Sequence, residues 1–265
     1  GLVTASLDNP FYGEIIKAIT REAKRRDYTL MLFDTDGSPA LEEKAVDTLL
    51  SYQVAGIILS VVSDAEDYCP AYLPKLEQAA IPVVQIDRKL HDATFAGVYL
   101  DNEESGLRGM RAVLAQGYRH VLVVGGPARS AITQARLAGI RRAIEECPDP
   151  VTLDVLEGDY TQAPACDRTA AYLQGGARPQ VIFGLNNLMT LGALEALRSQ
   201  GLSRADIQLF SIDQVPYAEL HGEPIACVSH SSYEAGAGAI GMLFEAIDEP
   251  GRTQADLTIK GTLLG

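Results

Sequence analysis

Polar side chains follow most of the short apolar runs of this chain, at the points where those runs end. They are Asp8, Asn9, Asp34, Asp36, Asp87, Arg88, Tyr160, Asn186, Asp213 and His230. Carboxylates and amides form paired hydrogen bonds with neighbouring hydroxyls, a guanidinium offers a planar fork of donors, and an aromatic face stacks on the CH face of a sugar ring. This mixture of groups suits a polyhydroxylated ligand.

The sequence lacks the local motifs on which common catalytic and nucleotide-binding sites depend. GxGxxG does not follow the first apolar run, and GxxxxGK[ST], GxSxG and HExxH do not occur. The turn Gly125-Gly126-Pro127 lacks the Lys and the hydroxyl that complete a phosphate loop. The cysteines are scattered without a CxxC pair, which disfavours a zinc or redox site and predicts reduced thiols. We therefore expect neither an enzyme nor a metal or cofactor site.

The elements that would position these side chains alternate along almost the whole chain. The predicted strands are 2–5, 29–33, 56–59, 83–86, 97–100, 121–124, 152–156, 181–183, 207–211 and 226–229. The predicted helices include 12–26, 41–52, 103–116, 133–145, 188–200 and 233–247. This alternation is typical of βα units around a parallel sheet, so the predicted fold class is α/β. Open parallel sheets bind ligands beyond the carboxyl ends of their strands, where the polar residues stand.

The series of strands and helices restarts around residues 100–102. A chain of 265 residues also exceeds the usual size of one compact unit. We therefore expect two doubly wound parallel-sheet lobes, the first formed by residues 1–101 and 231–250 and the second by residues 102–230 and 251–265. Because no Pro-, Ser- or Gly-rich linker separates them, we expect short crossovers that suit a hinge.

Charge and hydropathy limit the partners of the chain. The formal net charge of -13 would repel polyanions, so these residues are poor candidates for gripping nucleic acid by themselves. No apolar run approaches the roughly 20 residues of a membrane span. Residues 1–6 have the character of a core strand and lack the features of a secretory signal. We expect a cytoplasmic protein with no membrane contact.

A set of short segments in a fixed order resembles the LacI-type transcription regulators and the related periplasmic sugar-binding proteins. The segment Asp8-Asn9-Pro10-Phe11-Tyr12 is similar to the NPFF turn of these families. Further matches are DTDG at 34–37, VAGIIL at 54–59, IPVV at 81–84, IDR at 86–88, GYRH at 117–120, GGP at 125–127, ARLAG at 135–139, EGDY at 157–160, NNLMTLGAL at 186–194 and ID at 212–213. The resemblance covers essentially all 265 residues and implies a fold like that of type I periplasmic binding proteins.

By this resemblance, ten residues would line a ligand cleft between the lobes. They are Asn9, Phe11, Tyr12, Asp87 and Arg88 from the first lobe, and Arg136, Tyr160, Asn186, Asp213 and His230 from the second. His230 stands where these families usually have Gln, which replaces a neutral amide with a group that can titrate. Asn187 stands where they have Asp, at the position expected to cap the following helix. The identity and charge of the ligand stay open.

Seven of these ten residues also have a structural explanation that needs no ligand. The alternatives are a turn for Asn9, a core position for Phe11, mutual pairing for Asp87 and Arg88, a solvated helix face for Arg136, and an exposed position for Tyr160 and His230. Asp8, Asp34 and Asp36 are expected to be turn and cap residues. The resemblance favours the ligand roles over these alternatives.

Two functions fit the resemblance: the effector-binding core of a LacI-type DNA-binding repressor, or the periplasmic sugar-binding receptor of a transport system. In the regulator, closure around a sugar or sugar derivative allosterically changes the spacing of two DNA-binding headpieces in a homodimer. The segments GYRHVLVVGGP, QARLAGIRRAI and SSYEAGAGAIGMLFEAI favour the regulator, although the ending 261–265 lacks the Arg and Ser of the family's tail. We expect a core that reaches DNA only through a helix-turn-helix headpiece outside these residues.

Overall fold

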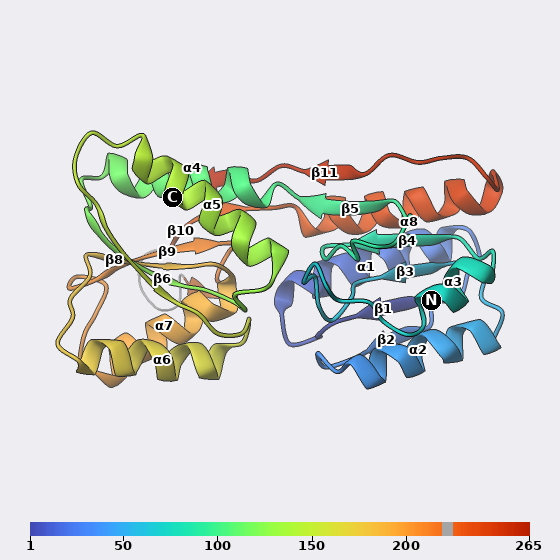
Figure 1. Cartoon of the computed structure of the whole chain (residues 1–265), viewed down its shortest axis with the longest axis horizontal. Helices are drawn as coiled ribbons and strands as arrows, with labels where there is room; N and C mark the ends of the chain where they lie inside the picture. The colour runs from blue at the N-terminus through green and yellow to red at the C-terminus, as the bar shows by residue number, and fades with distance from the viewer. Residues whose placement is uncertain (219–224) are drawn as a thin grey trace. The chain divides into compact units, whose positions relative to one another are not determined.

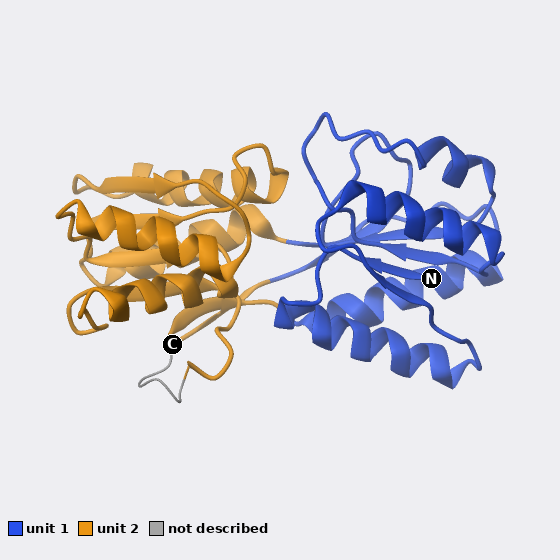
Figure 2. Cartoon of the chain, turned by 90° about the horizontal axis from the view of Figure 1, so that it is seen from below, with its two compact units in different colours: residues 1–100, 231–260 blue, residues 101–230, 261–265 orange. Residues whose placement is uncertain are grey.

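The computed structural model, which describes residues 1–218 and 225–265, divides the chain into two units (Figure 2). Unit 1 comprises Gly1–Leu100 and Ser231–Lys260, and unit 2 comprises Asp101–His230 and Gly261–Gly265. The chain therefore passes between the units three times. Residues 251–260, which we expected in the second lobe, belong to unit 1 because the strand that they contain joins the sheet of that unit.

Unit 1 holds a six-stranded sheet in which all neighbouring strands are parallel, in the order β11-β5-β4-β3-β1-β2 (Figure 1). Its strands are β1 (Leu2–Thr4), β2 (Leu32–Asp34), β3 (Ile57–Leu59), β4 (Val83–Ile86), β5 (Gly97–Leu100) and β11 (Leu257–Ile259). Its helices are α1 (Pro10–Arg25), α2 (Pro39–Ser51), α3 (Leu73–Gln78) and α8 (Ser232–Asp248).

The inner strands of the unit 1 sheet, β1, β3, β4 and β5, are buried on both faces, which explains their apolar character. Successive strand residues point to opposite faces. Leu2 and Ile58 accordingly pack with α1 and α8, whereas Val3, Ile57 and Leu59 pack with α2 and α3. Figure 2 shows helices on both sides of this sheet.

Unit 2 repeats the arrangement, with strand order β7-β6-β8-β9-β10-β12. Its strands are β6 (His120–Val124), β7 (Thr152–Leu156), β8 (Val181–Gly184), β9 (Gln208–Ile212), β10 (Ala226–Ser229) and β12 (Thr262–Leu264). Its helices are α4 (Asn102–Ala115), α5 (Ala131–Glu145), α6 (Gln162–Gln174) and α7 (Asn187–Ser199). The neighbouring strands are parallel except for β10 and β12, which are antiparallel.

The strand orders confirm the predicted α/β fold of two doubly wound sheets. In each unit the second strand along the chain lies at one edge and the third lies on the other side of the first, so the order reverses at the first strand. Doubly wound sheets bind ligands at such a switch point, beyond the carboxyl ends of the strands. Within residues 1–218 and 225–265, no helix combines the length and apolar composition that crossing a membrane requires.

Candidate functional site

In unit 1, α1 begins beyond the carboxyl end of β1, and three predicted site residues lie at its start: Asn9 before the helix, and Phe11 and Tyr12 within it. Asn9 caps the helix: its Oδ1 accepts a hydrogen bond from the backbone N–H of Phe11 at 3.0 Å. Pro10 follows at the first helical position, which its fixed φ suits. Phe11 and Tyr12 are buried, with ring centroids 5.5 Å apart in an edge-to-face arrangement. The structural alternatives for Asn9 and Phe11 therefore hold, whether or not a ligand also touches them.

Tyr12 links the ends of three strands. Its hydroxyl donates to Asp87 Oδ2 at 2.8 Å and lies 3.0 Å from Ser60 Oγ. Ser60 directly follows β3, and Asp87 directly follows β4. Burial and then the nearby Asp87 carboxylate raise the pKa of Tyr12, so the hydroxyl stays protonated and acts as a donor. Tyr12, Ser60 and Asp87 thus form one polar cluster at the carboxyl edge of the sheet.

Arg88 and Glu42 both hold the loop that follows β3. Arg88 Nη1 donates to the carbonyl oxygens of Val61, at 3.3 Å, and Val62, at 2.7 Å. Glu42, on the first turn of α2, accepts a hydrogen bond from the backbone N–H of Val62. The loop that positions the Arg88 guanidinium is therefore anchored to the body of the unit.

Glu42 is a fully buried carboxyl group that the sequence did not single out. It accepts hydrogen bonds from the hydroxyls of Tyr68 at 2.7 Å and Tyr72 at 2.6 Å. Burial raises the pKa of Glu42, while these hydrogen bonds and the charge of Arg88 act in the opposite direction. A buried carboxyl group is tolerated only with such partners, so this cluster fixes the loop in one conformation.

In unit 2, Arg136 lies on α5 and is only 4% exposed. Its Nε donates to Asn102 Oδ1 at 2.8 Å, and its Nη1 donates to the carbonyl oxygen of Leu185. Leu185 directly follows β8, so the guanidinium is held at the carboxyl end of that strand. The solvated helix face that we considered for Arg136 is therefore wrong.

Asn186 and Tyr160 meet at the beginning of α7. Asn186 Oδ1 accepts from the backbone N–H of Met189 at 2.7 Å, and its Nδ2 donates to the carbonyl oxygen of Tyr160 at 3.0 Å. The helix cap is thus Asn186 and not Asn187, which is the first helical residue. The Tyr160 hydroxyl lies 2.8 Å from Thr133 Oγ1 on α5. The amide of Asn186 therefore joins Tyr160 to α7.

The His230 side chain is completely buried between two carboxylates. Its Nδ1 lies 3.0 Å from Asp213 Oδ1, and its Nε2 lies 2.8 Å from Asp101 Oδ1 and 2.9 Å from Ser105 Oγ. Burial acts against the imidazolium, but hydrogen bonds with Asp101 and Asp213 outweigh it and raise the pKa of His230. The exposed strand-end position considered for His230 is therefore wrong.

Asp87 and Asp213 occupy equivalent positions in the two units. Each directly follows a strand, β4 or β9, and has a left-handed backbone, with φ of 66° and 63°. Each N–H donates to the next strand of its sheet, from Asp87 to the Val98 carbonyl at 2.9 Å and from Asp213 to the Val228 carbonyl at 2.7 Å. Asp tolerates this conformation better than most residues. Both units therefore use the same backbone device to place a carboxylate just beyond a strand.

Each unit brings its own predicted residues to the carboxyl edge of its own sheet. The sequence did not single out Ser60 or Asp101, although each directly follows a strand, β3 or β5. The rule that selected Asp87 and Asp213 would have found both. It would not have found Asn102 or Glu42, because these lie on helices and their partners are distant in sequence.

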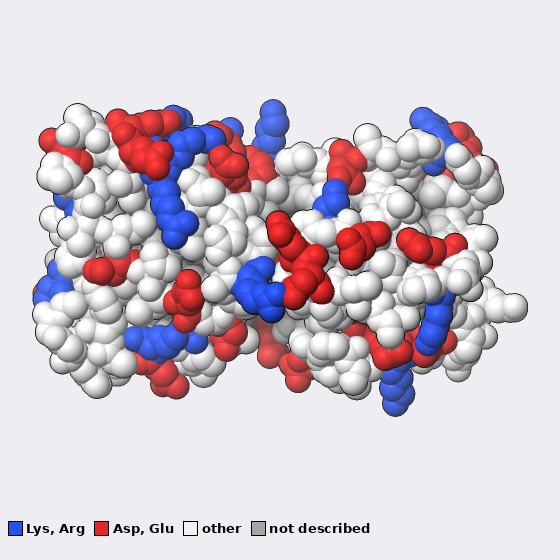
Figure 3. Space-filling model, viewed as in Figure 1, with Lys and Arg blue, Asp and Glu red and all other residues white. Residues whose placement is uncertain are grey.

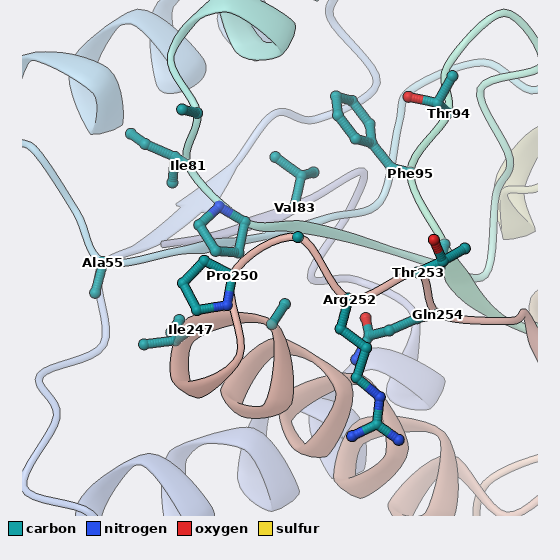
Figure 4. A pocket seen from close by; sticks show the side chains of 15 residues that line it. Ala55, Ile81, Val83, Thr94, Phe95, Ile247, Pro250, Arg252, Thr253 and Gln254 are labelled. Carbon is teal, nitrogen blue, oxygen red and sulfur yellow. The ribbon is translucent and has the colours of Figure 1, made fainter.

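A pocket of about 590 Å³ lies at the opposite, amino edge of the unit 1 sheet (Figure 4). It is lined by residues 80–83 at the start of β4, 94–96 before β5, and a segment from the end of α8 to residue 254. Figure 4 shows Phe95, Val83 and Pro250 around it. The residues that line it include none of the ten predicted ones. This pocket is therefore separate from the two polar clusters at the carboxyl edges.

Acidic and basic side chains are interleaved on the outer surface of unit 2. Arg142 on α5 pairs with Glu103 on α4 at 2.6 Å, and Arg108 pairs with Glu104 within α4 at 2.9 Å. Figure 3 shows red and blue side chains mixed over these helices. Such a surface offers no extended positive field to a polyanion.

The chain is similar to several known proteins. A model of the family described as periplasmic binding proteins and sugar binding domain of LacI family matches residues 1–264. The HTH-type transcriptional regulator DegA of Bacillus subtilis is 25% identical over 237 residues, which are 89% of this chain and 70% of DegA.

Two solved structures have the same fold. The Cra transcriptional dual regulator of Pseudomonas putida, in complex with fructose 1-phosphate, has a TM-score of 0.89 at 19% identity. The match covers 100% of this chain and 97% of the Cra chain. An ABC transporter solute binding protein of Bacillus halodurans, with bound myo-inositol, has a TM-score of 0.85 at 21% identity, with coverage of 100% and 93%.

Proposed function

Since this chain belongs to the family of periplasmic binding proteins and LacI-type sugar-binding domains, we propose that it is the effector-binding core of a DNA-binding transcription regulator. The observation that carries the proposal is the pair of polar clusters, one at the carboxyl edge of each sheet. Each cluster contains a left-handed Asp directly after a strand, Asp87 or Asp213. Each unit also holds an arginine at that edge, Arg88 or Arg136.

The ligand is a small polyhydroxylated molecule, a sugar or a sugar derivative, bound by the polar side chains at the carboxyl edges of the sheets. The carboxylates of Asp87 and Asp213 accept hydrogen bonds from hydroxyls, and Arg136 supplies donors. The ring of Phe11 or Tyr12 offers a face for the apolar side of a sugar. Fructose 1-phosphate in the Cra complex and myo-inositol in the solute binding protein belong to this class of ligand.

Binding changes the equilibrium between arrangements of the two units and so controls operator binding allosterically. A ligand shifts this equilibrium only by its difference in affinity for the two arrangements. The protein works in the cytoplasm as a homodimer, and DNA contact comes from a helix-turn-helix headpiece. No covalent step is part of this function, so the chain acts as a sensor and not as an enzyme.

Isothermal titration calorimetry tests the site directly. The probes are D-ribose, D-fructose 1-phosphate and myo-inositol, and the variants are Asp87→Asn and Asp213→Asn. We expect at least one probe to bind and each variant to weaken its affinity about 10- to 100-fold, the value of a hydrogen bond to a charged group. The control is Asp248→Asn, which removes an exposed pair with Arg26 and should leave the affinity unchanged. Full affinity in both site variants would exclude this site.

The second candidate function is the sugar-binding receptor of a transport system, favoured by the fold shared with the solute binding protein. The match to DegA, a transcriptional regulator, favours the regulator. Oligomeric state separates the two, because LacI-type control requires two copies. Sedimentation at high micromolar concentration should show a dimer, and a strict monomer would favour the receptor.

A further inference from the structure

Three residues at the passages between the units meet in one hydrogen-bonded cluster. Asp101 opens unit 2 after β5, His230 precedes the return to unit 1, and Gly261 re-enters unit 2 after β11. Asp101 Oδ1 lies 2.8 Å from His230 Nε2 and accepts from the backbone N–H of Gly261 at 2.9 Å. Through Asp101 Oδ1, hydrogen bonds therefore connect the three residues at which the chain enters or leaves unit 2.

The geometry of this cluster determines the charge of His230. An ionised carboxylate accepts hydrogen bonds and donates none. Nδ1 faces Asp213 and Nε2 faces Asp101, so both ring nitrogens carry hydrogen when both carboxylates are ionised. His230 is then an imidazolium. Arg136 on α5 is the nearby positive charge that opposes it, and the Cys227 thiol on β10 is the other titratable group beside Asp213.

The surroundings leave the ring little freedom. The His230 side chain has no exposed surface, and a Cβ atom at Gly261 would lie 3.0 Å from its Nε2. Ser105 Oγ, on α4, donates to Asp101 Oδ1 at 2.9 Å and lies at the same distance from the ring. A ring held on three sides transmits a displacement of one carboxylate to the other.

We propose that His230 is a positioning residue that holds the Asp213 carboxylate for the ligand and couples it, through Asp101, to the three passages between the units. His230 does not touch the ligand itself. The proposal rests on the proposed function in one respect, that Asp213 contacts the ligand. A Gln, which the resemblance implies at this position, has one donor nitrogen and cannot supply both N–H groups at opposite ends of a ring.

Side-chain ¹⁵N NMR of the ligand-free chain tests this coupling without any sugar. We expect both His230 ring nitrogens to be protonated near neutral pH. We expect Asp213→Asn to lower the pKa of His230 and to shift the backbone amide resonance of Gly261. Asp213 contacts His230, and Gly261 donates to Asp101. Because Asp213 and Gly261 are 48 positions apart, a shift at Gly261 would show that the change at Asp213 reaches Asp101 through the His230 ring.

The matched control is His120→Gln. His120 Nε2, on β6, also pairs with a carboxylate, Asp154 Oδ2 on β7, at 3.0 Å, but both of these side chains are partly exposed. The His120→Gln substitution should leave the Gly261 amide resonance unchanged. A neutral His230 ring near neutral pH, or a Gly261 resonance that ignores Asp213→Asn, would overturn the coupling. Both measurements use variants that retain His230, so the test does not depend on folding of a His230 variant.

A second measurement separates this inference from the proposed function. Calorimetry with D-ribose and D-fructose 1-phosphate compares the native chain, His230→Gln and His230→Leu. We expect affinity to fall in that order, by about tenfold or more for His230→Leu. Equal affinities would show that His230 does not position Asp213. If none of D-ribose, D-fructose 1-phosphate and myo-inositol binds the native chain, the proposed ligand class is wrong, and the NMR result still decides the coupling.

Discussion

The Tyr12 hydroxyl donates a hydrogen bond to Asp87 Oδ2 at 2.8 Å, across 75 positions of sequence. Tyr12 lies on the first turn of α1, and Asp87 follows β4 with a left-handed backbone. The hydrogen bond therefore holds the side chain of Asp87, whose backbone is strained, through Tyr12, which belongs to a different βα unit. The same contact brings the hydroxyl to Ser60, after β3. Tyr12 therefore helps to preorganise the carboxyl edge of the unit 1 sheet, together with the loop contacts of Arg88 and Glu42.

Tyr12→Phe removes that contact and keeps the buried ring. The substitution removes one hydrogen bond to Asp87 and one to Ser60 at a largely buried place, so we expect the free energy of unfolding to fall by about 1 to 2 kcal/mol. Urea denaturation measures it. Tyr52→Phe is the control, because Tyr52 is 68% exposed and should lose almost nothing. Equal effects of the two substitutions would contradict a role for the Tyr12 hydroxyl.

Glu42→Gln tests the buried anchor of the loop after β3. The Glu42 carboxylate accepts hydrogen bonds from two tyrosine hydroxyls and one backbone N–H. In Gln the amide nitrogen is itself a donor, so at least one of these three donors would lose its acceptor. We expect a loss of about 1 to 3 kcal/mol in the free energy of unfolding. Glu43→Gln, at a half-exposed neighbouring position that pairs with Lys75 at 3.8 Å, should cost under about 0.5 kcal/mol. A loss at Glu43 as large as that at Glu42 would show that charge, and not burial, matters here.

The pKa shifts at His230 and Asp101 predict how stability depends on pH. The pKa of His230 is raised above 6.5 in the folded state, so its contribution is complete below pH 6.5 and is lost as pH rises through the folded pKa. Burial alone would raise the pKa of Asp101, but hydrogen bonds from His230, Ser105 and Gly261 lower it below 3.8. The contribution of Asp101 is therefore present above pH 3.8 and is lost as pH falls through its lowered pKa.

The cluster therefore stabilises the fold most between pH 3.8 and 6.5. Thermal unfolding of the native chain and of His230→Gln across this range measures the difference. We expect it to be largest inside the window, on the order of 3 kcal/mol, because the substitution breaks a buried ion pair, and to shrink at higher pH. A difference that is constant with pH would contradict a charged His230.

Much of the fold was predictable because strands buried on both faces have a distinctive composition. Val83–Ile86 and Gly97–Leu100 are largely buried strands with the predicted bounds. The predicted strands ended at residue 229, but the structure has two further short strands in different sheets, β11 and β12. Local pattern could not reveal this, because the break at Lys260–Gly261 is a passage between units and not a turn.

Helices with weak apolar faces escaped prediction. Gln162–Gln174 has Pro164 in its first turn, and its buried side chains are mostly small, so its helical periodicity is faint. Leu73–Gln78 is only six residues long. Packing against α7 determines the longer of these two helices, and no single-sequence pattern records that packing.

In the candidate site, too, local sequence predicted some features, whereas others depend on residues distant in the sequence. Residue types after each strand predicted Asp87, Asp213 and His230, since the rule concerns only local sequence. The burial of His230 depends on Asp101, 129 positions away, and the burial of Arg136 depends on Asn102 and Leu185. Such distant partners decide whether a polar residue is exposed, so the residue types of His230 and Arg136 alone could not show that both are buried.

Two helical glycines make the sharpest test of packing around the unit 2 site. A Cβ atom at Gly139 on α5 would lie 1.9 Å from the carbonyl oxygen of Glu103 and 2.6 Å from the N of Leu107, both on α4. Because both atoms belong to the backbone, α4 and α5 must separate to admit even one methyl group. Gly139→Ala should therefore lower the free energy of unfolding by about 1 to 3 kcal/mol.

Gly13→Ala is the matched control, because Gly13 is also inside a helix, α1, but has nothing within 4 Å of its Cβ position. There the substitution should raise stability by about 0.5 to 1 kcal/mol, the usual advantage of Ala over Gly in a helix. Hydrogen exchange distinguishes the units: Gly139→Ala should reduce amide protection in unit 2, whereas Gly13→Ala should not reduce it in unit 1. Since α5 carries Arg136 and α4 carries its partner Asn102, separating the two helices also moves the guanidinium from Leu185. If Gly139→Ala proves as harmless as Gly13→Ala, then the contact of α4 with α5 does not position Arg136.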